Sequence, residues 1–382
     1  MMLLLVGITG VKLLVASLWG TTADIPQTLE QAQSFLAGED VLNPASTGGN
    51  PSFFPLGHYL LASWCLLASQ WTGLSFAFLI KAPAILADLL VALLLRLVPR
   101  GGDQAAFLYL VNPVTFLLSV YHGQLHTVAM AAAVLALWLD ARHSRWLVGL
   151  ALGMAAGIRQ HFGVLIVPFL LRRDTRRWVI ALSFGSMVGL MNVWFLTSAS
   201  PERLLAPTWT YGSWGYTMLL LQGPRVLAAL GFHGLTNALA QVNALLRAVG
   251  PAIYWVWTIG FLCWVWRRSH RTGIHPWEAA LLFLVGLYTV SPGFGVQWLV
   301  WAIPFWLVVN RLEAMGYCAL AGAFLIGSYW QWSLNAHYGG GALTTKLHLL
   351  TKVHLAGVIL VGAAGVATWL YAARTTWRLW RT

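Results

Sequence analysis

Long apolar runs with few charges dominate this sequence and limit what it can fold into. Crossing a bilayer as a helix takes about 20 mainly apolar residues. Of the 382 residues, 59% are hydrophobic and only 9% are charged, and the mean hydropathy is +0.71. A soluble protein carries about a quarter of its residues as charged ones. Runs suited to membrane helices lie near 2–19, 56–71, 75–96, 104–121, 124–140, 146–171, 177–198, 249–267, 277–291, 296–309, 313–330 and 352–373.

These runs predict an all-α, polytopic integral membrane protein, with about 11 to 12 membrane helices of the required length. No polar tail or low-complexity linker interrupts them, so residues 1–382 are expected to form one membrane domain. The net charge of +12 does not indicate a nucleic-acid partner, because the arginines cluster in short gaps between apolar runs. That clustering is typical of cytoplasmic loops. The three cysteines have unrelated spacings and suggest neither disulfides nor a metal knuckle.

Charge also predicts the topology of the first half of the chain. Residues 21–54 contain no Lys or Arg and are expected outside, whereas Arg96 and Arg100 are expected in the cytoplasm. An odd number of crossings must separate them, although two apolar helices lie between. We therefore expect 56–71, which follows Phe54-Pro55 and is short, to lie in the membrane interface. The first outer loop, 21–74, would then carry interfacial helices.

The run 146–171 begins and ends beside arginine clusters, so it is expected to be a hairpin of two short helices. Its tip, Gly157 to Gly163, holds Arg159, Gln160 and His161. A second long outer loop, 199–248, is mixed in character and aromatic, as is typical of a segment at the membrane surface.

Ionisable residues at membrane depth are costly and mark candidate functional sites. Asp24 follows the first helix on the outside and is either a helix N-cap or a functional carboxylate, or both. Lys81 and Asp88 share one helix face seven residues apart, too far to pair directly. Lys81 either snorkels to the interface or binds an anionic group. Asp88 needs an internal partner or a proton and is expected to be structural.

The outer turn around 121–126 presents His122, Gln124 and His126. Two histidines without a third local ligand do not make a zinc site, so we expect no metal and favour hydrogen bonding to a polar ligand or to the core. Arg159 at a buried hairpin tip calls for an anion, and phosphate is well matched to a guanidinium. Gln297 starts a helix among aromatic residues, and its role is open.

Taken in order, these segments resemble the GT-C glycosyltransferases that use polyprenyl-phosphate sugars, in particular the branch with GPI mannosyltransferase-like and related prokaryotic mannosyltransferases. The resemblance runs over nearly the whole chain. It rests on Asp24, Gln31 to Gly38, Phe53-Phe54-Pro55-Leu56, Lys81 with Pro83 and Asp88, Asn112-Pro113, Gly123-Gln124-Leu125-His126, and Gln297-Trp298 with Trp301 and Pro304. Two departures are the loss of one proline after Phe54 and His126 in place of a second carboxylate, which weakens a metal-dependent scheme.

The resemblance implies an inverting transfer of a hexose, with mannose favoured, from a polyprenyl-phosphate carrier to an acceptor hydroxyl outside the cytoplasm. Asp24 is the candidate catalytic base, and Lys81 and Arg159 are candidates to hold the phosphate. His122, Gln124, His126, Gln160, His161 and Gln297 are candidate donor-binding residues. No cofactor is expected. The partners would be the bilayer, the lipid-linked donor and a glycan, lipid or protein acceptor. In a bacterium the protein would lie in the inner or plasma membrane, with its site facing the periplasm or exterior.

Two other functions stay open at this point. A transporter or flippase of lipids or lipid-linked glycans would fit the broken segment at 146–171, but the sequence shows no internal repeat. A polymerase or ligase of lipid-linked glycans would share the donor chemistry.

Overall fold

The computed structural model describes residues 1–19, 24–41, 55–171, 176–198, 233–271, 273, 275–291, 295–333 and 351–381. Two compact units make up the chain. Unit 1 comprises Met1–Ala206, Val265–Ala280 and Ile303–Arg311, and unit 2 comprises Pro207–Trp264, Leu281–Ala302 and Leu312–Thr382. Each unit is described by itself.

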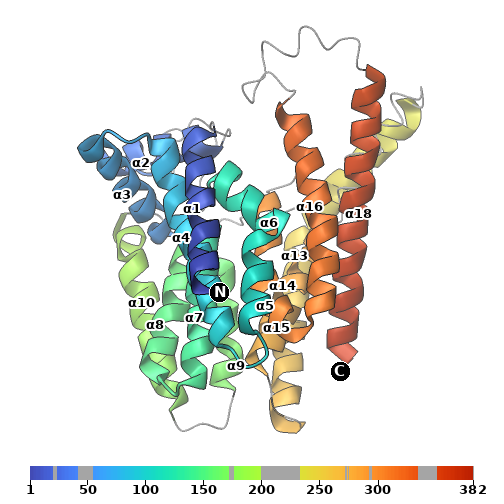
Figure 1. Ribbon diagram of the computed structural model, residues 1–382. Helices are drawn as coiled ribbons and strands as arrows, with labels where there is room; N and C mark the ends of the chain where they lie inside the picture. Colours follow the sequence, from blue (N-terminus) through green and yellow to red (C-terminus); the bar gives the residue numbers. More distant parts are fainter. Residues whose placement is uncertain are drawn as a thin grey trace. The chain divides into compact units, whose positions relative to one another are not determined.

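Every regular element in the described residues is a helix, which confirms the all-α prediction (Figure 1). The elements are α1 (Met2–Leu18), α2 (Asp24–Leu36), α3 (Leu56–Thr72), α4 (Phe76–Leu97), α5 (Gly102–Val111), α6 (Pro113–Phe116), the π-helix η1 (Leu117–His122), α7 (His126–Ala141), α8 (Arg145–Ile158), the 3-10 helix η2 (Gln160–Ile166), α9 (Val167–Leu170), α10 (Arg177–Ser198), α13 (His233–Arg271), α14 (Pro276–Val290), the 3-10 helix η4 (Val296–Val300), α15 (Ile303–Val309), α16 (Arg311–Ser333) and α18 (Thr351–Arg381).

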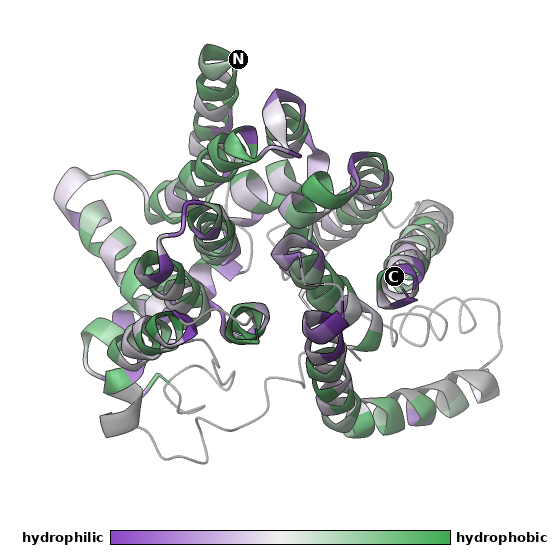
Figure 2. Ribbon diagram, turned by 90° about the horizontal axis from the view of Figure 1, so that it is seen from below, coloured by the Kyte–Doolittle hydropathy of each residue, from purple (hydrophilic) through white to green (hydrophobic). Residues whose placement is uncertain are grey.

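The helices have the apolar character of membrane segments. Phe76–Leu97 and Arg311–Tyr329 are each long and apolar enough to cross a bilayer, and two bent helix pairs pass the same test. Figure 2 shows hydrophobic residues along most of the helix length. In α1, Leu3 and Leu18 are 88% and 79% exposed. Apolar surface of this kind suits contact with lipid, as expected for an integral membrane protein.

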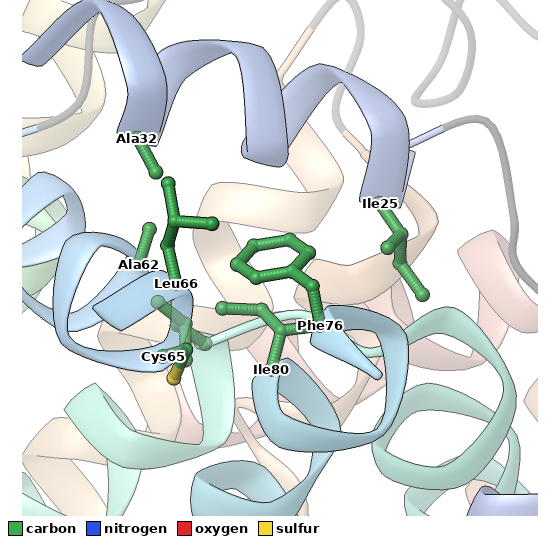
Figure 3. Packing of buried hydrophobic residues seen from close by; sticks show 8 residues of the cluster. Ile25, Ala32, Ala62, Cys65, Leu66, Phe76 and Ile80 are labelled. Carbon is green, nitrogen blue, oxygen red and sulfur yellow. The ribbon is translucent and has the colours of Figure 1, made fainter. Parts of the chain in front are cut away.

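Helix α2 is amphipathic and lies over the ends of its neighbours in unit 1. Ile25 and Ala32, on its buried face, pack in one cluster with Ala62, Cys65 and Leu66 of α3, Phe76 and Ile80 of α4, and Leu125 (Figure 3). At the other end of unit 1 lie the α4–α5 turn and the α7–α8 turn (Figure 1). The first of these turns follows Arg96 and the second carries Arg142 and Arg145. Helices α2 and α3 are the ones expected within the first outer loop, and their position in a membrane stays a prediction.

The hairpin expected over 146–171 is present as a break at Arg159. Helix α8 ends at Ile158, Arg159 has extended backbone (φ −144°, ψ 107°), and η2 begins at Gln160. The chain doubles back there, because a Cβ built on Gly163 would lie only 3.5 Å from the Cβ of Ala156. In a straight helix, residues seven apart are about 10.5 Å apart along the axis.

Small residues allow α8 to approach α10 closely. Gly149, Gly153 and Gly157 recur every four residues on the α8 face that meets α10. A Cβ built on Gly153 would lie 2.7 Å from the Cβ of Met187, which is nearer than real Cβ atoms come. Such spacing of small residues is a common way for membrane helices to pack.

One straight helix is expected over 104–121, but the structure has two helical segments with a bend between them. Helix α5 ends at Val111, and the following segment Pro113–His122 is bent from it by 50°. Pro113 lacks an amide hydrogen, so the helix ends before it, and Asn112 then caps the next turn by accepting a hydrogen bond from Thr115 N (3.0 Å). The chain continues as η1, whose wider turn is seen in the 3.1 Å bond from Gly123 N to Leu118 O, five residues back.

In unit 2, polar side chains link neighbouring helices. The Tyr317 hydroxyl donates to Leu299 O at 3.0 Å, and Arg378 pairs with Glu313. Most of the loop expected over 199–248 lies outside the described residues, which resume at 233. From there the chain is helical as α13, with a 41° bend between Gly250 and Ala252, where Pro251 stands.

Candidate functional site

Asp24 is the first residue of α2. It is the one carboxylate among the residues that the sequence predicts for the site. Its side chain is 25% exposed, so a ligand can reach it from solvent. The buried face of α2 fixes its position, because Ile25, the next residue, belongs to the α2–α3–α4 cluster. The Thr28 hydroxyl donates to Asp24 O at 2.7 Å within the first turn.

Two side chains of the turn after η1 hold the Asp24 carboxylate. His122 Nε2 lies 2.8 Å from Asp24 Oδ2, and Gln124 Nε2 donates to the same oxygen at 2.9 Å. Burial raises the pKa of Asp24, but the charge and hydrogen bond of His122 and the hydrogen bond of Gln124 outweigh it, so the pKa lies below its ordinary value of 3.8. Asp24 is therefore ionised at neutral pH.

Arg159, buried at the break between α8 and η2, is linked to this carboxylate through Gln124. It is 2% exposed, and its guanidinium donates toward Ile158 O (2.9 Å), His126 Nε2 (3.1 Å), His58 Nδ1 (3.2 Å) and Gln124 Oε1 (3.4 Å). Gln124 thus joins the two charges: its amide nitrogen faces Asp24 and its amide oxygen faces Arg159. The predicted grouping of Asp24, His122, Gln124, His126 and Arg159 is present.

His58 is a site residue that the sequence did not indicate. A guanidinium only donates, so His58 Nδ1 accepts from Arg159, and Nε2–H then donates to Gln31 Oε1 at 3.2 Å. This tautomer requires a neutral ring. Burial, and then the charge of Arg159, lower the pKa of His58 well below its ordinary value of 6.5. The close approach of α3 to α8, which brings His58 to Arg159, depends on Gly57, since a Cβ there would lie 2.6 Å from Gly157 O.

Lys81 reaches the same turn from α4. It is fully buried, donates to Trp19 O at 3.1 Å, and its stem packs against Gly123. A Cβ built on Gly123 would lie 2.9 Å from Lys81 Cγ, and φ at Gly123 is +72°, so glycine is required there on both grounds. Both interpretations of Lys81, snorkelling to the membrane interface and binding an anionic group, stay predictions.

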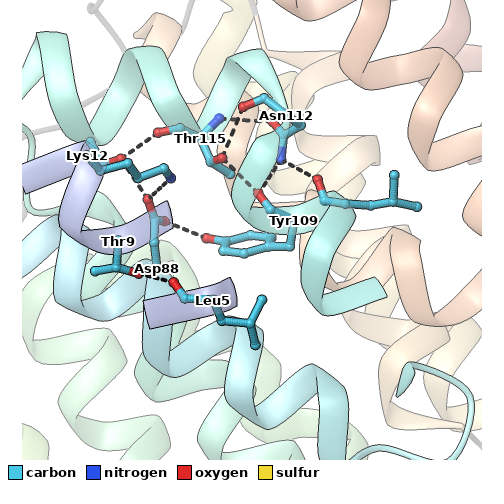
Figure 4. A network of polar contacts seen from close by, with 9 residues as sticks. Leu5, Thr9, Lys12, Asp88, Tyr109, Asn112 and Thr115 are labelled. Carbon is cyan, nitrogen blue, oxygen red and sulfur yellow. Dashed lines mark hydrogen bonds and ion pairs between the residues drawn. The ribbon is translucent and has the colours of Figure 1, made fainter. Parts of the chain in front are cut away.

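Asp88 was expected to have a buried partner, and that partner is Lys12 and not Lys81. Lys12 of α1 donates to Asp88 Oδ2 at 2.9 Å, and the Tyr109 hydroxyl donates to Oδ1 at 2.8 Å (Figure 4). Both charged side chains are buried. Lys12 was missed, although a lone lysine inside an apolar helix is itself a signal.

The remaining predicted residues take different places. His161 is buried two residues after Arg159, whereas Gln160 between them is exposed. Gln297 is buried in η4 and belongs to unit 2, while the other predicted residues belong to unit 1. The donor-binding roles of these three residues stay predictions.

The site combines a partly exposed carboxylate with buried cationic groups. Such a carboxylate can accept a proton from a bound hydroxyl, and a guanidinium and an ammonium can stabilise an anion. Among the described residues, no three His, Cys, Asp or Glu side chains are placed to hold a metal ion. Metal independence stays a prediction.

The chain was compared with known protein families, curated sequences and solved structures. No family model matches the chain, and no curated protein sequence matches it. The chain is similar to the crystal structure of ArnT from Cupriavidus metallidurans bound to undecaprenyl phosphate. The identity is 15%, over 98% of this chain and 77% of that chain, with a TM-score of 0.49.

Proposed function

We propose that the protein is an inverting membrane glycosyltransferase of the GT-C type. It would move a hexose, with mannose favoured, from a polyprenyl-phosphate carrier to an acceptor hydroxyl on the non-cytoplasmic face. One observation carries the proposal: a partly exposed, ionised Asp24 and a buried Arg159 lie on either side of one amide, Gln124. Such a transfer needs one group to accept a proton and another to stabilise a leaving phosphate.

In the proposed reaction, Asp24 accepts the proton of the acceptor hydroxyl as its oxygen attacks the anomeric carbon. The bond between that carbon and the phosphate oxygen breaks on the opposite face, and its electron pair stays on the lipid phosphate. The product therefore has inverted configuration at the anomeric carbon. His122 and Gln124 keep the carboxylate ionised and oriented.

Arg159 and Lys81 are proposed to bind the phosphate. Of the Arg159 hydrogen bonds given above, the one to Gln124 is the longest, at 3.4 Å. A phosphate oxygen would replace it, because the phosphate carries a negative charge and can pair with the guanidinium through two oxygens, whereas the amide oxygen is neutral. The neutral imidazoles of His58 and His126 hold the guanidinium in place without neutralising it.

The proposal is tested with purified protein in liposomes, radiolabelled polyprenyl-phosphate mannose or glucose, a membrane extract as acceptor, and EDTA. Asp24→Asn should lower transfer by about 100-fold or more while donor binding is kept. The matched control is Asp103→Asn, because Asp103 is an exposed carboxylate of α5 that pairs with Arg96. Transfer by Asp24→Asn at the wild-type rate would exclude Asp24 as the base. Absence of transfer by the wild type from both donors would contradict the proposed activity.

A flippase is the second candidate, favoured by the helix break at Arg159. The same variant separates the two functions. A flippase moves its lipid without removing a proton from an acceptor, so Asp24→Asn should leave movement of a labelled lipid across the liposome membrane unchanged.

A further inference from the structure

A buried polar network lies behind the π-helix that carries His122. Asp88 Oδ2 accepts a hydrogen bond from Lys12 Nζ at 2.9 Å, and Oδ1 accepts from Tyr109. The Ser119 hydroxyl lies 2.6 Å from Asp88 Oδ2 and 2.5 Å from Thr115 O, and its one hydrogen is shared between these two acceptors. These side chains come from α1, α4, α5 and η1 and are buried (Figure 4). Ser119 lies in the middle of η1, three residues before His122.

The π-helical geometry of η1 explains how Ser119 can contact Asp88 while His122, three residues later, contacts Asp24. In an α-helix, residues three apart lie on nearly the same face. A π-helix closes its hydrogen bonds five residues back and has a wider turn, so residues three apart are further separated around the axis. Ser119 therefore bonds to Asp88, while His122 bonds to Asp24. Gly123, with φ +72°, ends the π-helix and begins the turn to Gln124.

Apolar packing holds η1 against α1 and α4, the two helices that carry the Lys12–Asp88 ion pair. Val120, next to Ser119, packs in a cluster with Ala16 of α1 and Ile85 of α4. The ring of Trp19, just past the end of α1, lies 5.3 Å from that of Tyr121. Helices α1 and α4 thus support η1, and only its last residue, His122, reaches Asp24.

We infer that the Lys12–Asp88 ion pair acts through Ser119 to position His122 against Asp24. Asp88, Lys12 and Ser119 are then positioning residues for the transfer reaction, and this inference rests on the proposed function. A buried charge pair is a poor source of net stability, because desolvation offsets much of its attraction. Its use here is to place an anionic acceptor at a fixed point for a hydroxyl on the π-helical segment.

The test is Ser119→Ala, which removes one hydroxyl and keeps the ion pair. We expect kcat to fall about tenfold, equivalent to about 1.4 kcal/mol in the barrier, with donor binding unchanged and with Ser119→Thr restoring activity. Thr9→Ala is the matched control, since the buried Thr9 hydroxyl donates only within α1, to Leu5 O. Loss of kcat in Thr9→Ala equal to that in Ser119→Ala would overturn the inference.

A double-mutant cycle with His122→Gln shows whether Ser119 acts through His122. In that background Ser119→Ala should cost nothing further, because the side chain that it positions is already gone. Independent, additive losses would overturn the inference. Replacing the pair together, Lys12→Met with Asp88→Leu, should keep the fold and give the same tenfold loss, whereas full activity would contradict the role of the pair.

A second measurement needs no transferase activity. Diethyl pyrocarbonate modification of the peptide containing His122, followed by mass spectrometry, should be slow in wild type, where His122 is 3% exposed, and several-fold faster in Ser119→Ala. Equal rates in the two proteins would contradict the positioning of His122. If no protein transfers sugar while Ser119→Ala still exposes His122, then the proposed function fails and the positioning holds.

Discussion

Placing a second carboxylate beside Asp24 should trap a proton on this proposed base. Gln124→Glu does this, because the Gln124 amide nitrogen that lies 2.9 Å from Asp24 Oδ2 becomes a carboxylate oxygen. Two unit charges at that distance repel by about 6 kcal/mol at an effective dielectric constant of about 20. That is an upper limit of about 4 pKa units. Since Asp24 is partly exposed and Arg159 faces the new group, we expect a shift of about 2 to 3 units.

The proton should reside on Asp24, because Arg159 stabilises the ionised form of the new carboxylate. In wild type the pKa of Asp24 lies below 3.8, so activity should be level down to that pH and fall only below it. In Gln124→Glu the base becomes ionised only as pH rises through the raised pKa. Transfer should therefore be weak in acid and recover toward neutral or alkaline pH.

The assay is the pH dependence of sugar transfer between about pH 4 and 9. Gln104→Glu is the matched control, because Gln104 also faces an arginine, Arg311, but lies on α5 away from the site. It should keep the wild-type profile. A loss in Gln124→Glu that is the same at every pH, or an unchanged acid limb, would refute the proton-trap argument.

Three further predictions concern the supports of the site. Lys12→Met should destabilise the protein by about 3 to 5 kcal/mol, because it leaves the buried Asp88 charge unpaired; thermal unfolding in detergent measures this, and an unchanged midpoint would contradict it. Gly153→Leu should destabilise by about 1 to 3 kcal/mol through overpacking against α10, whereas Gly185→Ala, where a Cβ meets nothing within 4 Å, should unfold like wild type. Lys81→Met should weaken donor binding about tenfold, the loss of one charge-assisted contact, with Lys81→Arg closer to wild type; equal affinity in a lipid-binding assay would exclude Lys81 from the phosphate site.

Local patterns were enough to predict the helices and the hairpin. The arginine clusters on both sides of 146–171 required an even number of crossings, and the break at Arg159 meets that requirement. The bend at Asn112-Pro113 was not predicted. Hydropathy over 104–121 is continuous, and the deciding features are a missing amide hydrogen and a buried network around Tyr109 and Thr115.

The sequence predicted five residues that the structure brings together, Asp24, His122, Gln124, His126 and Arg159, but not His58 and not their contacts. Order along the chain suggested that Asp24, the 121–126 turn and Arg159 belong together. Which atoms meet depends on contacts between residues about 100 apart, such as Gln124 with Asp24 and His58 with Arg159. The sequence does not indicate His58, because it lies in an apolar helix and has no motif around it. Its approach to Arg159 depends on the absence of a side chain at Gly57.

In the proposed reaction, Asp24 removes a proton during glycosyl transfer from a polyprenyl phosphate. The most direct measurement is a single turnover, in which protein loaded with labelled donor is mixed with acceptor and bond formation is followed. Wild type and Asp24→Asn should bind donor equally, and Asp24→Asn should form product about 100-fold or more slowly. Equal rates of bond formation from equally loaded proteins would contradict the account.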